Sequence, residues 1–431
     1  MTEKLLQFIW QFQYLNKDAF QTTNGEELSV IHPGQLNVHQ GPDFFNGRIK
    51  IGSTEWAGHI EIHLKSSDWF RHRHETDPHY GKVILHVVWL HDAEVQDENG
   101  QQIAVVELQN RVSNLLLAQY ESWMNNPDQI PCGKAITGVD NLVWNHWLDR
   151  LLAERLLEKC SRVTKQLEAT EMHWEETCWQ LVCTYFGGPV NKESFAQIAQ
   201  SVPLRILAKH KNVPAQLEAL LIGQSGLLHK GFTDDYPQML YREYQFLQKK
   251  YGLRVVNRPP VYLRMRPDDF PTIRLAQLAM LVHNSSGLFS KLLEAPTLRE
   301  ASLHFEVCAN DYWHYHYKPD VEGEYKPKQT GKSLIDRVLL NAVIPVLFSY
   351  GHHQIRDDVR AKALQWMEQL PAETNRYTKL FHALGKKANN AGESQALLLL
   401  KTEYCDARRC LECAIGNALL KPRKNIIASG K

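Results

Sequence analysis

The stretch from Gly41 to His91 holds the densest group of metal-binding and proton-transferring side chains in the sequence. Imidazoles and carboxylates are the groups that bind divalent metals and exchange protons near neutral pH. The histidines are His59, His63, His72, His74, His79, His86 and His91, and the acids are Asp43, Glu61, Asp68, Glu75 and Asp77. We therefore expect any chemical function of the chain to lie in this stretch.

The segment HIEIHLK, residues 59–65, alternates polar and apolar residues as a half-buried β-strand does. Side chains two residues apart on a strand share a face. Glu61, His63 and Lys65 therefore point to one side, and the isoleucines and leucine between them point to the other. The polar side is suited to a cleft, because it carries a carboxylate, an imidazole and an ammonium in a row.

A second carboxylate is expected close to this strand. Asp43 lies just before a predicted strand around residues 48–51, and a hairpin through Gly52-Ser53 would make the two strands neighbours. Asp43 and Glu61 would then converge on one point. Two such carboxylates bind Mg²⁺ or Mn²⁺ and leave coordinated waters to be activated.

This arrangement resembles the active-site pattern of the PD-(D/E)xK, or restriction-endonuclease-like, nucleases. Pro42-Asp43 corresponds to the PD half, and Glu61-Ile62-His63 to the (D/E)xK half. The resemblance implies that Asp43 and Glu61 bind Mg or Mn, that a neighbouring base helps to activate water, and that the substrate is nucleic acid. The chain departs from the pattern at His63, where the family usually has Lys, and Lys65 on the same face is the substitute.

A separate cluster follows the strand. His72 and His74 have the His-x-His spacing that can present two rings to one metal, with Asp68 and Asp77 nearby. One reading is therefore a hydrolase stabilised by zinc or iron, and the other is a loop whose side chains bond to its own backbone. His86, inside the apolar run VILHVVWL, fits a core histidine or a partner behind Glu61.

The cysteines Cys405, Cys410 and Cys413 form the one close cysteine group in the sequence. Three thiolates in nine residues fit zinc or an iron–sulfur cluster, each of which needs a fourth ligand. The candidates for that ligand are Cys132, Cys308 and His382. Some restriction-like nucleases carry a cysteine-bound iron–sulfur cluster, which the grouping resembles in general terms, and the alternative is a helix with small buried cysteines.

Composition excludes several classes of protein. The 431 residues carry a formal net charge of +1, so nucleic-acid binding would need a local basic patch. We expect no membrane association, because no apolar run approaches the length of a span. The start of the chain reads as an amphipathic helix rather than a signal peptide, and eight scattered cysteines fit reduced thiols. Cytoplasm is the expected location.

The periodicity of the chain changes near its first quarter. From about 28 to 108 it predicts five short strands, including a central strand VILHVVWL, and Asn99-Gly100 is a hairpin signal. Long helical patterns then follow a Pro-containing loop. We predict an α+β or α/β chain, with a mixed-sheet domain at 1–125 and helical domains with the cysteine cluster at 134–431.

The whole chain resembles an uncharacterised bacterial family, known as a domain of unknown function. The resemblance rests on GPDFFN, WAGHIEIHLKSSDW, VILHVVW, RMRPDDFPTIRLAQLA, NAVIPVLFSYG and YCDARRCLECAIGN. It implies a soluble bacterial protein and no established activity. The residues then favour a metal-dependent nuclease, and the alternative is a non-catalytic scaffold or binding protein whose polar cluster is structural. Protein partners and oligomeric state stay open.

Overall fold

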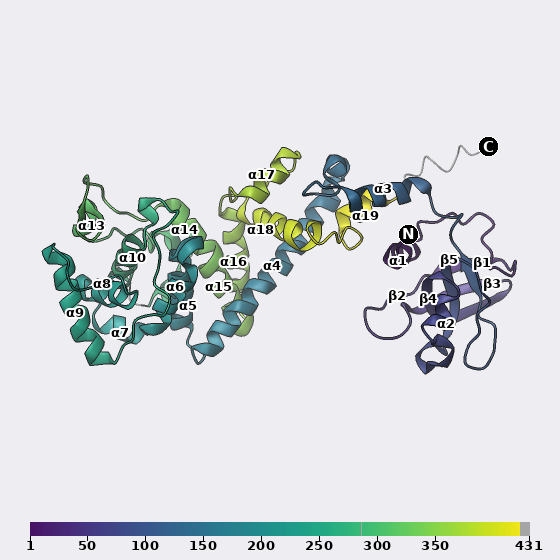
Figure 1. The fold of residues 1–431 in the computed structure, drawn as a ribbon, viewed down its shortest axis with the longest axis horizontal. Coiled ribbons are helices and arrows are strands. Elements are labelled where there is room, and N and C mark those ends of the chain that lie inside the picture. The colour runs from purple at the N-terminus through teal and green to yellow at the C-terminus, as the bar shows by residue number, and fades with distance from the viewer. Residues whose placement is uncertain (286, 423–431) are drawn as a thin grey trace. The chain divides into compact units, whose positions relative to one another are not determined.

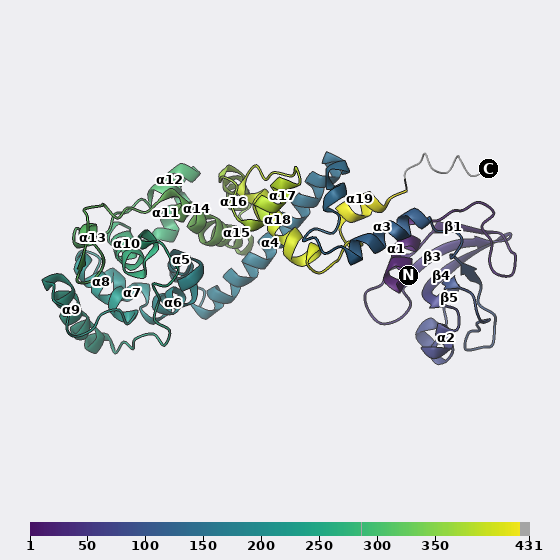
Figure 2. The same ribbon diagram turned by 45° about the horizontal axis from the view of Figure 1, so that its top comes forward.

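The computed structural model describes residues 1–285 and 287–422. The chain divides into two compact units, Met1–Trp147 with Leu400–Lys431, and Leu148–Leu399. Figures 1 and 2 show a β-sheet in the first unit and helices in the second. The predicted class is confirmed: a mixed sheet with flanking helices precedes a mostly helical region.

One sheet forms the centre of the first unit. Its strands are β1 (Leu28–His32), β2 (Gln35–Leu36), β3 (Phe44–Ile51), β4 (Thr54–Lys65), β5 (Val83–Leu90) and β6 (Val105–Glu107). The order is β1-β3-β4-β5-β6, with β2 paired to β3. The strands up to β4 pair antiparallel, whereas β4 with β5 and β5 with β6 pair parallel.

Two features of this sheet agree with the sequence. Ile51 pairs with Thr54, so β3 and β4 form the predicted hairpin through Gly52-Ser53. The apolar run of β5 lies between β4 and β6, and residues 85–88 are fully buried. Such a strand is covered on both faces, which explains why it shows no alternation of polar and apolar residues.

Short helices flank the sheet. The helices of the first unit are α1 (Glu3–Phe12), α2 (Asp68–Arg71), α3 (Asn114–Asn125) and α19 (Ala414–Leu420), and α4 (Asn141–Ala169) begins there. Both α1 and α2 pack against β4. On α1, Leu5, Leu6 and Ile9 are buried at helical spacing. From α2, Trp69 packs against β5 and β6 through Val88 and Val105.

The Asn99-Gly100 signal does not produce a hairpin between β5 and β6. It makes a tight turn closed by a single bridge, Gln96 with Gln102. Because β6 runs parallel to β5, the intervening chain must return to the end of the sheet from which β5 started. Asn99-Gly100 does form a turn, but the parallel pairing of β5 with β6 depends on contacts that this turn does not determine.

The compact units differ from the predicted division at 125–134. The first unit continues to Trp147 and also includes the chain from Leu400 onward. The C-terminal cysteines therefore belong to the unit that contains the sheet and not to the helical unit. A contact between α19 and the turn Gly133–Gly138 holds this segment there. No local sequence signal indicates such a return, because the two segments lie far apart along the chain.

The second unit is helical and has one extensive buried core. Its helices are the rest of α4, then α5 (Trp174–Phe186), α6 (Gly188–Ser201), α7 (Leu204–Lys209), α8 (Pro214–Gln224), α9 (Asp235–Tyr251), α10 (Pro271–Asn284), α11 (Leu288–Glu294), α12 (Leu298–Leu303), α13 (Tyr312–Tyr315), α14 (Lys332–Val338), α15 (Ile344–His353), α16 (Asp357–Gln369), α17 (Arg376–Ala383) and α18 (Ala391–Leu399). A small hairpin, β7 (His316–Lys318) and β8 (Val321–Glu322), completes it.

One helical stretch of the second unit, Lys332–His353, has the length and apolar composition of a membrane span. In the structure 72% of its apolar window is buried. This burial is typical of the core helix of a folded protein, and the stretch contributes Val338, Leu339 and Leu347 to the core.

A buried carboxyl group lies in the helical core. Glu218 on α8 is fully buried, and its Oε2 accepts hydrogen bonds from Trp313 Nε1 at 2.8 Å and from the Tyr236 hydroxyl at 3.0 Å. Its Oε1 has no partner among the described residues. Burial raises the pKa of Glu218 to about 7, although the two donors oppose the shift.

This carboxyl group should make the stability of the protein depend on pH. Since the pKa of Glu218 is higher in the folded chain, its contribution is fully present below about pH 4.5 and is lost as the pH rises through about 7. Glu218→Gln mimics the protonated form. Relative to this variant, the wild type should lose about 3 kcal/mol of unfolding free energy between pH 4.5 and 8. Urea denaturation at both pH values measures this, and equal losses in both proteins would contradict it.

Candidate metal centre

Asp43 and Glu61 meet at the β3–β4 hairpin. Phe44 pairs with Ile60, which places the residue before β3 beside Glu61. The Asp43 N–H donates to Glu61 Oε2 at 3.0 Å, and the Ile62 N–H donates to Asp43 Oδ2 at 3.2 Å. These reciprocal bonds fix both carboxyl groups to the backbone of the other strand. The structure thus brings together the two acids that the sequence analysis selected.

Helix α1 and a bulge in β3 support this meeting. Gln7 Nε2 donates to Asp43 Oδ1 at 2.9 Å, so a side chain from α1 orients the carboxylate. The pairing of β3 with β4 shifts register between Phe44 and Gly47. Within the bulge Asn46 adopts φ 56, a left-handed conformation that Asn tolerates well. The bulge therefore changes the direction of the chain at the start of β3, while the pairing from Gly47 to Ile51 stays regular.

The histidines form one cluster around Glu61. His63 Nε2 lies 3.5 Å from Glu61 Oε1, and His74 Nε2 lies 3.5 Å from the same oxygen. His63 Nε2 also contacts His72 Nδ1 at 3.0 Å. One ligand atom from each of His63, His72 and His74 lies within 4.8 Å of the other two. A carboxylate oxygen and three imidazole nitrogens thus surround one small volume.

The segment after β4 carries two of these histidines to the site. It begins with α2, where Asp68 Oδ2 accepts from the Lys65 N–H at 3.2 Å and Trp69 Nε1 donates to the Gln96 carbonyl at 3.1 Å. Arg73 adopts φ 60, which separates α2 from the following turn. The ring of Tyr80 stacks on His74 at 3.7 Å between centroids. The segment is therefore anchored on both sides of the histidine pair.

The carboxyl groups are hard to ionise in this environment. Burial raises the pKa of Glu61 to about 9, and the nearby charge of Asp43 adds to the effect. Burial also raises the pKa of Asp43 to about 6, with a further contribution from Glu3 and an opposing hydrogen bond from Gln7. Two buried acids that repel each other are a common arrangement where a cation binds.

The imidazoles are neutral in the same environment. Burial lowers the pKa of His63 to about 2, that of His74 to about 4 and that of His86 to about 3, and the neighbouring histidines add to each shift. Neutral imidazole is the form that binds a metal. His63 Nδ1 contacts His86 Nε2 at 2.9 Å, which orients the His63 ring from behind and leaves Nε2 toward Glu61.

This donor set fits a transition metal. Nitrogen from imidazole suits Zn²⁺, Fe²⁺ and similar ions, and a carboxylate oxygen suits them as well as Mn²⁺. The four atoms are Glu61 Oε1, His63 Nε2, His72 Nδ1 and His74 Nε2. His72 is exposed, whereas Glu61 and His63 are buried. A metal held here would face solvent on the His72 side.

The remaining predicted residues lie elsewhere. Lys65 is exposed at the end of β4, where its charge contributes to lowering the pKa of Asp92. Cys405, Cys410 and Cys413 are buried in another part of the same unit. The His72–His74 pair, which the sequence suggests as a separate cluster, lies against His63. No local pattern indicates the contact, because it depends on the register of β4 with β5, in which Glu61 pairs with His86.

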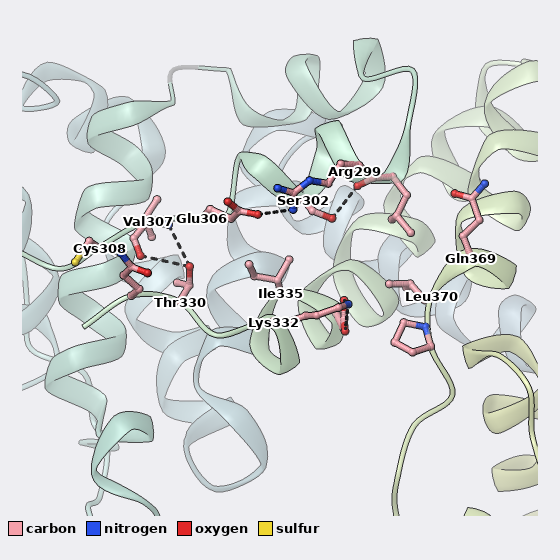
Figure 3. A pocket seen from close by; sticks show the side chains of 14 residues that line it. Arg299, Ser302, Glu306, Val307, Cys308, Thr330, Lys332, Ile335, Gln369 and Leu370 are labelled. Carbon is pink, nitrogen blue, oxygen red and sulfur yellow. Dashed lines mark hydrogen bonds and ion pairs between the residues drawn. The ribbon is translucent and has the colours of Figure 1, made fainter. Parts of the chain in front are cut away.

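The helical unit contains a different kind of pocket. A cavity of about 620 Å³ is lined by residues of α12, α14 and the chain between 306 and 330. Figure 3 shows its charged side chains paired with one another. Arg299 binds Glu306 at 2.7 Å, and Lys332 binds Asp336 at 2.8 Å. Because these charges are already neutralised, the cavity offers a weaker case for chemistry than the cluster around Glu61.

If the cluster around Glu61 binds a metal, the order of stability of the wild type and Glu61→Gln should depend on whether metal is present. Because the folded pKa of Glu61 is raised, the contribution of this residue is full below about pH 4.5 and is lost as the pH rises through about 9. In chelator at pH 8, Glu61→Gln should therefore be more stable than the wild type by at least about 1.4 kcal/mol, the value of a tenfold change in proton affinity. The gap should narrow at pH 5.

Saturating Zn²⁺ or Mn²⁺ should reverse this order, because the wild type gains more binding free energy from the metal. Thermal denaturation with chelator and with metal measures both effects. Glu55→Gln, an exposed change on the same strand, is the control and should show neither. A Glu61→Gln variant that is less stable than the wild type in chelator at pH 8 would contradict the account.

Comparison with known proteins identifies the family. The family described as "Protein of unknown function (DUF2851)" matches residues 3–376, which cover the sheet, the cluster around Glu61 and most of the helical unit. No curated protein matches the chain, and no solved structure matches it. The extent of the family match confirms the resemblance found in the sequence. The chain therefore belongs to the DUF2851 family of proteins of unknown function.

Proposed function

We propose that this protein is a metal-dependent phosphodiesterase that cleaves nucleic acid. The observation that carries the proposal is the convergence of Asp43 and Glu61 at the β3–β4 hairpin. His63, two residues after Glu61 on β4, contacts the Glu61 carboxyl group. Paired carboxylates and imidazoles around one point are the groups that hold a hydrolytic metal. We further propose a cytoplasmic location, where nucleic acid and reduced thiols both occur.

The chain order of the first unit supports this proposal. The first helices and strands follow as α1, β1, β2, β3, β4, α2 and β5, and within the sheet β4 pairs parallel with β5. This succession of a helix, a strand, an Asp-bearing hairpin, a Glu-bearing strand, a helical turn and a buried strand fits the order in the PD-(D/E)xK nucleases that the sequence resembles. The acids occupy the hairpin and the strand that the resemblance assigned to them.

The residues divide the work as follows. Glu61 and His63 bind the metal, with His72 and His74 completing the set. A divalent cation there supplies charge stabilisation at phosphorus and lowers the pKa of water. Asp43 lies beside this position, and its pKa of about 6 suits a group that accepts a proton near neutral pH.

His63 takes a different role from the lysine of the resembling family. Its pKa of about 2 makes it a weak base, and its Nδ1 is occupied by His86. We therefore assign it to metal binding and not to proton transfer. Lys65 is exposed at the end of β4, and we assign it a contact with substrate phosphate and not the role of the missing lysine.

Cations beside the centre suit a phosphate-bearing substrate. Arg71 and Arg73 are exposed in the segment that carries His72 and His74, and Arg71 also forms an ion pair with Asp68 at 3.0 Å. Arginine binds phosphate oxygens in a bidentate manner, and contacts of this kind position nucleic acids without reading their sequence. Because the chain as a whole is nearly neutral, such local cations would have to supply the attraction.

An activity assay tests the proposal. Purified wild-type protein should cleave labelled DNA or RNA in the presence of Mn²⁺, Zn²⁺ or Mg²⁺, and chelator should abolish cleavage. Glu61→Gln should lower the rate at least about 10-fold, because mutation of residues that only orient metal ligands already costs about 10- to 100-fold. Glu55→Gln is the matched control, because it removes one carboxylate from the same strand at an exposed position.

Two outcomes would contradict the proposal. One is equal cleavage by Glu61→Gln and Glu55→Gln, which would place the activity outside this centre. The other is metal binding by the wild type without hydrolysis of any nucleic acid offered. That second result would favour the alternative, a non-catalytic protein in which the metal stabilises the sheet unit.

A further inference from the structure

Four buried cysteines come together from two distant parts of the first unit. Cys132 follows α3, whereas Cys405, Cys410 and Cys413 belong to the returning segment from Leu400. Each is at most 9% exposed, and none forms a disulfide. The sequence left the partner of the three C-terminal cysteines open among Cys132, Cys308 and His382. The last two belong to the other unit.

Hydrogen bonds fix the two segments to each other beside the cysteines. Arg408 Nη1 donates to the Trp123 carbonyl at 3.1 Å, and its other amino group donates to the Asn126 carbonyl. Asn126 Nδ2 in turn donates to the Pro131 carbonyl at 3.0 Å, immediately before Cys132. The guanidinium therefore links the turn after Cys405 to the loop that leads into Cys132.

The loop between Cys410 and Cys413 is tightly folded. The Cys413 N–H donates to the Cys410 carbonyl at 3.4 Å. Gly416 approaches the same carbonyl so closely that a Cβ at this position would lie 2.1 Å from the oxygen. A side chain there would displace the Cys410 backbone, so this close turn requires glycine. Two cysteines in a Cys-x2-Cys turn of this kind can direct both sulfurs to one ligand.

The four thiols share one electrostatic environment. Burial raises the pKa of Cys132 to about 12 and that of Cys410 to about 11. The charges of Cys132, Cys410 and Cys413 all raise the pKa of Cys405, and the charges of Cys410 and Cys413 raise that of Cys132. Thiolate sulfur is the form of cysteine that binds zinc or iron.

We propose that Cys132, Cys405, Cys410 and Cys413 form a tetrathiolate site that binds zinc or an iron–sulfur cluster. Four cysteine sulfurs are the usual ligand set for both. Among the described residues, the four sulfurs do not all lie within 4.8 Å of one another, so a single zinc would draw the thiols together. The metal fastens the segment from Leu400 to the Cys132 loop. This site is separate from the histidine centre and does not depend on the proposed function.

Metal analysis of the full-length protein with visible spectroscopy tests this site. The wild type should contain either zinc without visible absorption, or iron and acid-labile sulfide with broad visible absorption. In the zinc case, exchange with Co²⁺ should give thiolate-to-cobalt absorption bands, which report sulfur ligands and exclude the histidine centre. Cys132→Ser should lose most of the thiolate bands or cluster, whereas the control Cys308→Ser should retain them.

The wild type also provides a test that needs no variant. Removal of the metal from the intact protein should make four additional thiols reactive toward a thiol reagent, and peptide mapping should identify them as these four cysteines. The proposal is overturned if the wild type binds no thiolate-ligated metal, if Cys132→Ser retains the full signal, or if other cysteines become reactive.

Discussion

Crowding of acids and imidazoles at one end of β4 is the constraint on which the site depends. The β3–β4 hairpin brings Asp43 and Glu61 together, and the chain after β4 folds back to place His72 and His74 against His63. In a buried setting the carboxylates resist ionisation and the imidazoles stay neutral. A divalent cation would stabilise the charged carboxylates and would bind the nitrogens of the neutral imidazoles.

Side chains from the surrounding elements hold the carboxyl and imidazole groups in place. Gln7 from α1 orients Asp43, His86 from β5 orients His63, and Tyr80 covers His74. Trp69 fills the adjoining core on the same side of the sheet. Holding these groups together without a metal lowers the free energy of unfolding, as is common for binding sites that are arranged before the ligand binds.

Local sequence patterns were sufficient to predict the strands and the β3–β4 hairpin, but they did not predict which distant segments contact one another. Alternation along residues 59–65 identified the polar face of β4, and Gly52-Ser53 identified the hairpin that joins Asp43 to Glu61. The return of the histidine pair onto His63 depends on the parallel pairing of β4 with β5, which no turn signal specifies. The approach of Cys132 to the C-terminal cysteines likewise depends on a segment that rejoins the sheet unit after the helices.

The central claim is that one metal binds at the histidine and glutamate cluster. Crystals of the full chain soaked in Mn²⁺ or Zn²⁺, with anomalous diffraction recorded at the absorption edge of the metal, test it most directly. The account predicts an anomalous peak about 2.0–2.2 Å from Glu61 Oε1, His63 Nε2 and His74 Nε2. Anomalous peaks that lie only away from these atoms, in crystals where the cluster is open to solvent, would contradict it.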